Sequence, residues 1–303
     1  MKPERGAALI VAMLIVALAV IATSNFVFHT HIHWRKLENA ANTDQARWLL
    51  RAAEQWGATV LLDDALQNSV DHLGETWGRE MPPVVAEGYH MSGRILEQNG
   101  LFNLNNLVLD GKVNDSQLVV FRRLLLNAKL PAGLANAIAD WLDADDAASG
   151  ESGAESEYYL RQSPPVRAAN RPIVNLNELL HVRGMTPELL EQLRPYVSVL
   201  PKSGPINVNT APPQVIAALS DTMSLDEAHV LAAKRDHAHF RNAGDLRNAM
   251  DNKPGIDERQ VSFASQYFLV VVQIRHDRIA LESQALFERN GQNFPNLVWR
   301  AAR

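Results

Sequence analysis

The longest apolar run of the chain extends from Gly6 to Phe28 and contains no charged residue and no proline. About 20 consecutive apolar residues are enough for a helix to cross the hydrocarbon core of a bilayer. Lys2 and Arg5 precede the run, and basic residues favour the cytoplasmic side of a membrane. The pattern therefore predicts a membrane-spanning helix over residues 7–28, with the bulk of the chain on the other side of the membrane.

The apolar pattern continues past this span at helical spacing. No glycine or proline, the two strongest helix breakers, occurs between Gly6 and Gly57. The apolar positions are Leu37, Ala40, Ala41, Trp48, Leu49, Ala52, Ala53, Trp56 and Val60. We therefore expect one long helix, a stem, whose apolar stripe packs against a later part of the chain.

Strand-like alternation occurs near both ends of the remaining chain. Residues 89–96 alternate, and Asn99-Gly100 predicts a hairpin turn that leads into a returning strand over residues 101–104. β-Branched runs over residues 267–274 and 279–287 flank a polar turn at His276-Asp277-Arg278, and residues 297–299 suit a last strand. These runs predict an antiparallel sheet as the partner of the stem.

Helical periodicity dominates between the two groups of strands. The predicted helices cover residues 116–126, 134–142, 176–180, 187–193, 213–219, 225–235 and 244–250. The simplest organisation is a sheet domain split by an inserted helical domain. The predicted boundaries are 7–28 for the membrane part of the stem, 29–106 and 262–303 for the two parts of the sheet domain, and 107–261 for the insert.

Composition restricts the function classes. The formal net charge of -5 argues against a general nucleic-acid binder, which normally carries a basic surface. The chain has no cysteine, so packing or a bound metal has to provide its rigidity outside the cytoplasm. Motifs for a nucleophile elbow, a phosphate loop, a zinc protease and a dinucleotide site are missing from the sequence, so we do not expect an enzyme.

The junction Arg5-Gly6, placed directly before the apolar run, resembles the leader of a type IV prepilin. The resemblance implies a leader over residues 1–6, cleavage between Gly6 and Ala7 by a prepilin peptidase, and methylation of the new N-terminus. A plain signal-anchor, or a signal peptide cut after Ala19, remains an alternative. The fifth mature position, where most pilin-like proteins carry a glutamate, is Val11, and its absence suggests a subunit with no neighbour ahead of it in the fibre.

Together with the large helical insert, these features resemble the protein K family of type II secretion systems, which are large minor pseudopilins. The resemblance implies an α+β fold: a pilin-like N-terminal transmembrane helix packed on an antiparallel sheet, with a large all-α domain, similar to SAM or helix-hairpin-helix domains, inserted in the sheet. It also implies an inner-membrane anchor, a periplasmic body at the pseudopilus tip, a role in export across the outer membrane, and the minor pseudopilins H, I and J as partners.

One loop of the insert is rich in acidic residues and in glycine and serine. Calcium prefers hard oxygen ligands at loosely specified angles, which such a loop can supply. The spacing does not match an EF-hand, and a solvated acidic linker is the alternative. The family resemblance implies calcium sites in the helical domain, so we expect a calcium site built from Asp143, Asp145, Asp146, Glu151, Glu155 and Glu157.

Two other functions remain open at this stage. Asn175-Leu-Asn177 and Asn207-Val-Asn209 each open a predicted helix, and the second copy resembles the entry to a helix-hairpin-helix unit. A membrane-anchored DNA-binding or DNA-uptake protein is therefore one alternative, although asparagine before a helix is usually a cap. A minor pilin of a type IV pilus is the other.

Overall fold

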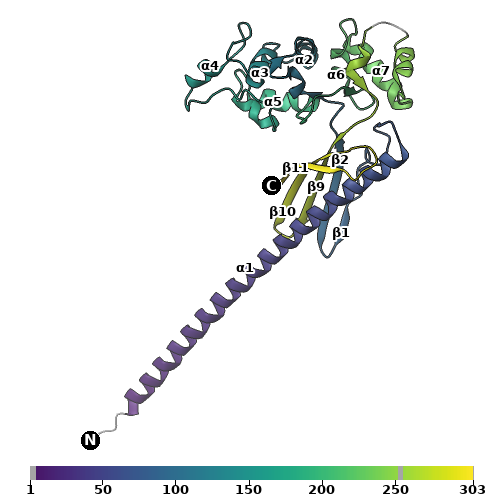
Figure 1. Cartoon of the computed structure of the whole chain (residues 1–303). Helices are drawn as coiled ribbons and strands as arrows, with labels where there is room; N and C mark the ends of the chain where they lie inside the picture. Colours follow the sequence, from purple (N-terminus) through teal and green to yellow (C-terminus); the bar gives the residue numbers. More distant parts are fainter. Residues whose placement is uncertain (1–4, 252–254, 303) are drawn as a thin grey trace.

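A single helix, α1 (Arg5–Gln67), forms the N-terminal stem of the chain. The structure is a computed structural model that describes residues 5–251 and 255–302, with the side chains of residues 5–7 left out. Most of α1 projects freely, and only its C-terminal part packs on the sheet (Figure 1). The predicted stem is therefore confirmed. The helix contains Gly57 where it contacts the sheet. A Cβ added at Gly57 would lie 3.0 Å from Val270 Cγ1, so the missing side chain allows this close approach.

The sheet has five strands in the order β1-β2-β9-β10-β11, and every neighbouring pair is antiparallel. Leu50, Ala58 and Leu61 of α1 are buried in one core with strand residues such as Val270 and Ile274. The expectation that the sheet covers the apolar stripe of the stem is thus confirmed. The strands are β1 (Val84–Ala86), β2 (Tyr89–Glu97), β9 (Tyr267–His276), β10 (Ile279–Glu288) and β11 (Asn296–Ala302).

The predicted hairpin at Asn99-Gly100 is wrong. The segment after it, β3 (Phe102–Asn103), pairs in parallel with β6 (Val197–Ser198) inside the helical domain and does not return along β2. The neighbours of β2 are β1 and β9, and the Asn99 side chain accepts hydrogen bonds from the amides of Gln266 and Tyr267 where the chain re-enters the sheet. Asn99 therefore ties the exit and the re-entry of the chain together.

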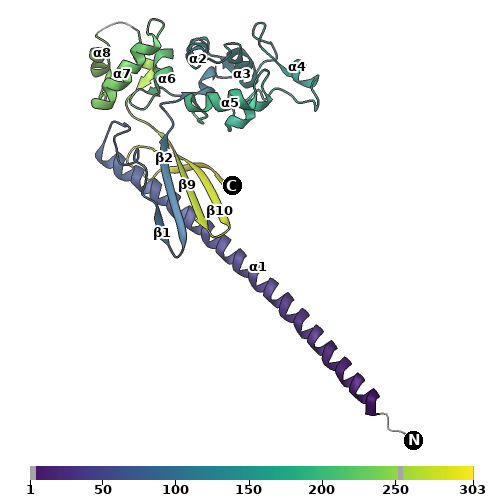
Figure 2. The ribbon, with the colours of Figure 1, turned by 180° about the vertical axis from the view of Figure 1, so that it is seen from behind.

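The helical domain occupies the sequence between β2 and β9 and lies beyond the upper end of the sheet (Figures 1 and 2). The predicted helices are confirmed in place, the one near residue 176 as a 3-10 helix, and α4 was not predicted. The helices are α2 (Asp115–Asn127), α3 (Leu134–Leu142), α4 (Ser156–Leu160), α5 (Pro187–Leu193), α6 (Pro213–Ala218), α7 (Leu225–His237) and α8 (Ala243–Ala249), with 3-10 turns η1 (Leu104–Leu107), η2 (Leu176–His181), η3 (Arg194–Tyr196) and η4 (Glu258–Gln260). Short strand pairs join β4 (Val108–Leu109) to β5 (Lys112–Val113) and β7 (Ile206–Asn207) to β8 (Val261–Ser262).

Candidate functional site

Three buried carboxylates meet where α3 ends in the helical domain. Asp140 lies on α3, Asp143 caps its C-terminus, and Glu155 stands directly before α4. One carboxylate oxygen from each residue lies within 4.8 Å of one from each of the others. The residues are 0%, 2% and 4% exposed, so bulk water has little access to solvate their charges. A cluster of this kind is costly unless a cation or protons compensate it.

The loop between Asp143 and Glu155 is folded back onto α3 by specific hydrogen bonds. The amide of Ser149 donates to Asp140 Oδ2 at 2.9 Å, and Arg183 Nη1 donates to the carbonyl of Gly153 at 2.9 Å. Gly153 approaches the cluster so closely that an added Cβ would lie 2.3 Å from Asp140 Oδ2. The backbone of the loop is thus held against the carboxylates, as a site that uses both side-chain and backbone oxygens requires.

Four oxygens of this cluster are buried without a hydrogen-bond partner: Asp140 Oδ1, Asp143 Oδ1 and both carboxylate oxygens of Glu155. Burial raises the pKa of Asp143 to about 7, with repulsion from Asp145 and Asp140 as the next causes. Burial also raises the pKa of Glu155 to about 8, assisted by the charge of Asp143. Buried polar atoms are normally satisfied, so these four converging oxygens fit a bound cation.

The structure brings together only two of the six carboxylates that the sequence singled out. Asp143 and Glu155 belong to the cluster, whereas the other four, Asp145, Asp146, Glu151 and Glu157, are exposed and lie outside it. Of these, Glu157 is paired with Arg161. Asp140 was missed because it belongs to a helix and not to the acidic loop. Its position three residues before Asp143, on the same helix face, was the available signal.

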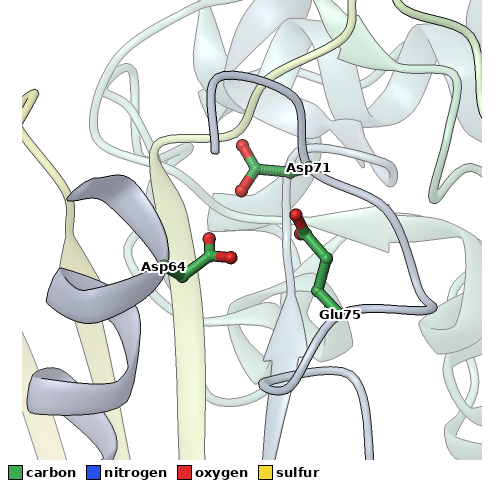
Figure 3. A group of neighbouring side chains, drawn as sticks. All are labelled: Asp64, Asp71 and Glu75. Carbon is green, nitrogen blue, oxygen red and sulfur yellow. The ribbon is translucent and has the colours of Figure 1, made fainter. Parts of the chain in front are cut away.

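A second group of buried carboxylates lies at the C-terminal end of α1 and comprises Asp64 on the helix and Asp71 and Glu75 in the loop after it (Figure 3). The guanidinium of Arg289 already supplies positive charge to this group. Arg289 Nη1 donates to Asp64 Oδ2 at 2.8 Å, and Arg289 Nη2 donates to Asp71 Oδ1 at 2.5 Å. Trp77 Nε1 donates to Glu75 Oε2 at 2.7 Å. We therefore interpret this group as a structural ion-pair network and not as a metal site.

The asparagines of the two repeats make hydrogen bonds within the protein itself. Asn175 caps η2 in a capping box with Glu178. Asn207 and Asn209 are 0% and 1% exposed. The Asn207 side chain donates to the carbonyl of Asp71, and that of Asn209 donates to the carbonyl of Phe240. Buried amides that satisfy the protein's own backbone are unavailable to bases or phosphates.

The remaining candidate residues lie on the stem. The backbone of Gly6 and Ala7 belongs to the first turn of α1, and Val11 is 56% exposed on the same helix. The part of α1 that the structure describes has one segment long and apolar enough to cross a membrane, and its residues are not buried by the rest of the protein. Large apolar side chains are also exposed further along the stem, namely Trp34, Leu37, Trp48 and Trp56. The stem thus offers an apolar surface both at the predicted membrane span and beyond it.

A long stem helix on an antiparallel sheet, with an inserted helical domain that carries an acidic cluster, defines a pilin-like protein with an additional domain. Family models described as type II secretion system protein K match residues 100–202 and 206–268. The chain belongs to the type II secretion system protein K family.

Individual relatives agree with this assignment. Type II secretion system protein K of Pseudomonas aeruginosa is 33% identical over 286 residues, which cover 90% of this chain and 85% of that protein. The protein of the same name from Aeromonas hydrophila is 29% identical and covers 96% of this chain and 95% of that protein. A chain in the crystal structure of the GspK-GspI-GspJ complex from the type 2 secretion system of enterotoxigenic Escherichia coli has a TM-score of 0.75 at 21% identity, covering 88% of this chain and 99% of that chain. This likeness confirms the predicted fold.

Proposed function

We propose that this chain is a minor pseudopilin of a type II secretion system, that it caps the tip of the periplasmic pseudopilus, and that it helps to export folded proteins across the outer membrane. The observation that carries the proposal is the likeness of its fold, over 88% of the chain, to a chain of the GspK-GspI-GspJ complex. The proposed role is structural, with no catalysis by this chain. Neither a DNA-binding role nor a type IV pilus role receives comparable support.

The proposed partners are the minor pseudopilins H, I and J, which would pack on the stem. Trp48 and Trp56 are 67% and 53% exposed on α1 beside the sheet, and clusters of exposed large apolar side chains typically mark protein interfaces. Two features support a position at the tip. The helical domain lies beyond the end of α1 that faces away from the N-terminus, where it would obstruct a further subunit (Figure 1). Val11 provides no carboxylate to pair with a subunit ahead of it.

We propose that the chain is anchored in the inner membrane by α1, with its N-terminus in the cytoplasm and its body in the periplasm. The proposed processing by prepilin peptidase separates Gly6 from Ala7. Intact mass spectrometry of the full chain, expressed with and without the peptidase, tests this step. The expected result is a peptidase-dependent loss of residues 1–6, with a methylated Ala7 at the new N-terminus, and no loss in a Gly6→Val control. An unprocessed native chain in the presence of an active peptidase would contradict the proposal.

We also propose that Asp140, Asp143 and Glu155 hold a calcium ion that stabilises the helical domain. The four unpartnered buried oxygens support this assignment, because a divalent cation that prefers oxygen ligands would satisfy them together. When bound, the ion would supply the positive charge that the cluster lacks and would join the end of α3 to the start of α4. The loop that connects these helices would then be held closed without a disulfide.

A further inference from the structure

The sheet domain and the helical domain meet at a joint beside the C-terminal end of α1. The joint is made by Asp71 in the loop after α1 (Figure 3). The amide of Asp71 donates to the carbonyl of Phe263 at 2.9 Å, and Asp71 Oδ2 accepts from the amide of Ser265 at 2.6 Å. The carbonyl of Asp71 accepts from Asn207 Nδ2 of the helical domain at 3.1 Å. The next residue of this loop, His72, also reaches the helical domain.

His72 stacks on His239, which belongs to the connection between α7 and α8. The two ring centroids are 3.9 Å apart and the rings are inclined by 10°. His72 Nδ1 accepts a hydrogen bond from the amide of Gly74 at 3.1 Å, so this nitrogen carries no proton in the stacked arrangement. Protonation of His72 would remove this acceptor, and protonation of both rings would place two positive charges face to face.

The charged groups around the pair determine whether the rings can become protonated. From α1, Asp64 favours a charged His72, but Arg289 is paired with this carboxylate. From the loop, the Glu75 carboxylate accepts a hydrogen bond from the backbone amide of His72. On the other side of the joint, Asp245 interacts electrostatically with His239, and Arg241 Nε donates to Asp245 Oδ2.

These surroundings favour the neutral form of His72. Burial is the main cause that lowers the pKa of His72 below its ordinary value, and the neighbouring His239 lowers it further. The stack is therefore stable while both rings are neutral, and protonation destabilises it as the pH falls through the range in which histidine titrates.

We propose that the His72–His239 stack is an acid-sensitive latch that fixes the orientation of the helical domain relative to the stem and sheet. With both rings neutral, the latch is closed and the domain has one orientation. With both rings protonated, repulsion opens this contact, and the domain keeps the Asp71 joint, the Lys202–Glu288 ion pair, the packing of Leu200 against Tyr267 and Leu286, and the two chain connections. The orientation of the domain at the end of the molecule would then respond to the pH outside the cytoplasm.

Distance measurements between spin labels test the latch in the full chain, extracted in detergent. The chain has no cysteine, so Ala233→Cys on α7 and Ala280→Cys on β10, both at exposed positions, accept labels selectively. Double electron-electron resonance at pH 8 and at pH 5 spans the titration of histidine. The expected result is a narrow distance distribution at pH 8 and a broader, shifted one at pH 5.

Variants separate the latch from other titrating groups. His239→Phe retains an aromatic ring for stacking and cannot be protonated, so its distribution should remain narrow at pH 5. His237→Phe, at the exposed end of α7, is the matched control and should broaden as the native chain does. A native distribution that is unchanged at pH 5, or a His239→Phe variant that broadens like the native chain, would overturn the proposal.

Discussion

Asp140 is fully buried at the end of α3, and one of its oxygens has no hydrogen-bond partner. We expect Asp140→Asn to abolish stabilisation by calcium while leaving the metal-free protein folded, because asparagine can still accept from the amide of Ser149. At a calcium concentration 100 times the dissociation constant, the native chain should gain about 2.7 kcal/mol. Thermal unfolding with calcium and with a chelator measures this gain. Asp145→Asn, an exposed position outside the cluster, is the control that should keep it. An Asp140→Asn variant stabilised as much as the native chain would refute the site.

Asp143 and Glu155 also make the stability of the metal-free chain depend on pH. Burial raises the pKa of these groups to about 7 and about 8. The folded chain therefore binds more protons than the unfolded chain, so its stability should rise as the pH falls from 8 to 6. Calcium should remove most of this difference, since it replaces the protons at pH 8. Midpoints measured in chelator for the native chain and for Asp143→Asn check the effect, which should be smaller in the variant. If the midpoint of the native chain does not rise more than that of the variant when the pH is lowered from 8 to 6, this assignment is contradicted.

At the residue scale, the sequence located the region of the buried carboxylate cluster better than its members. The acidic loop and the family resemblance together suggested calcium, which stays a prediction. The selection of Asp143 and Glu155 over Asp145 and Glu151 depends on how the loop folds back onto α3, and hydrogen bonds far apart in the sequence determine this fold. Arg183, which holds the loop through the carbonyl of Gly153, lies 30 residues beyond it.

At the scale of elements, the contact between α1 and the last strand of the sheet includes an ion pair whose carboxylate is buried and whose guanidinium is partly exposed. Glu54 of α1 is 0% exposed and accepts from Arg300 Nε of β11 at 2.6 Å. Arg300→Met should cost about 3 kcal/mol in the free energy of unfolding, because it leaves a buried carboxylate unpaired. Arg47→Met is the matched control, since its pair with Asp44 is exposed and worth at most about 1 kcal/mol. Denaturant unfolding followed by tryptophan fluorescence measures both variants. Equal stability of the two variants would show that the pair does not hold the stem.

The helices of the chain could be predicted from periodicity, caps and breakers, all of which are local signals. The same local reasoning failed at Asn99-Gly100, where a turn-forming pair leads into the helical domain. The partner of β3 is β6, which lies almost a hundred residues away, and the Asn99 side chain bonds to amides at Gln266 and Tyr267. Pairings over such distances leave no periodic pattern in the sequence, so only the structure could reveal them.

At the scale of the whole molecule, the stem, the sheet and the helical domain together suit a subunit that binds others along its stem and ends a fibre. The most direct test is coexpression of the full chain with the I and J minor pseudopilins of its own secretion system, followed by light scattering of the detergent extract. We expect one defined complex that contains all three proteins and does not extend into a polymer. Trp48→Glu with Trp56→Glu should weaken this complex, because both side chains are exposed on the stem, whereas Arg47→Met should leave it intact. A full chain that elutes apart from both partners, or that polymerises alone, would contradict its assignment as a capping minor pseudopilin.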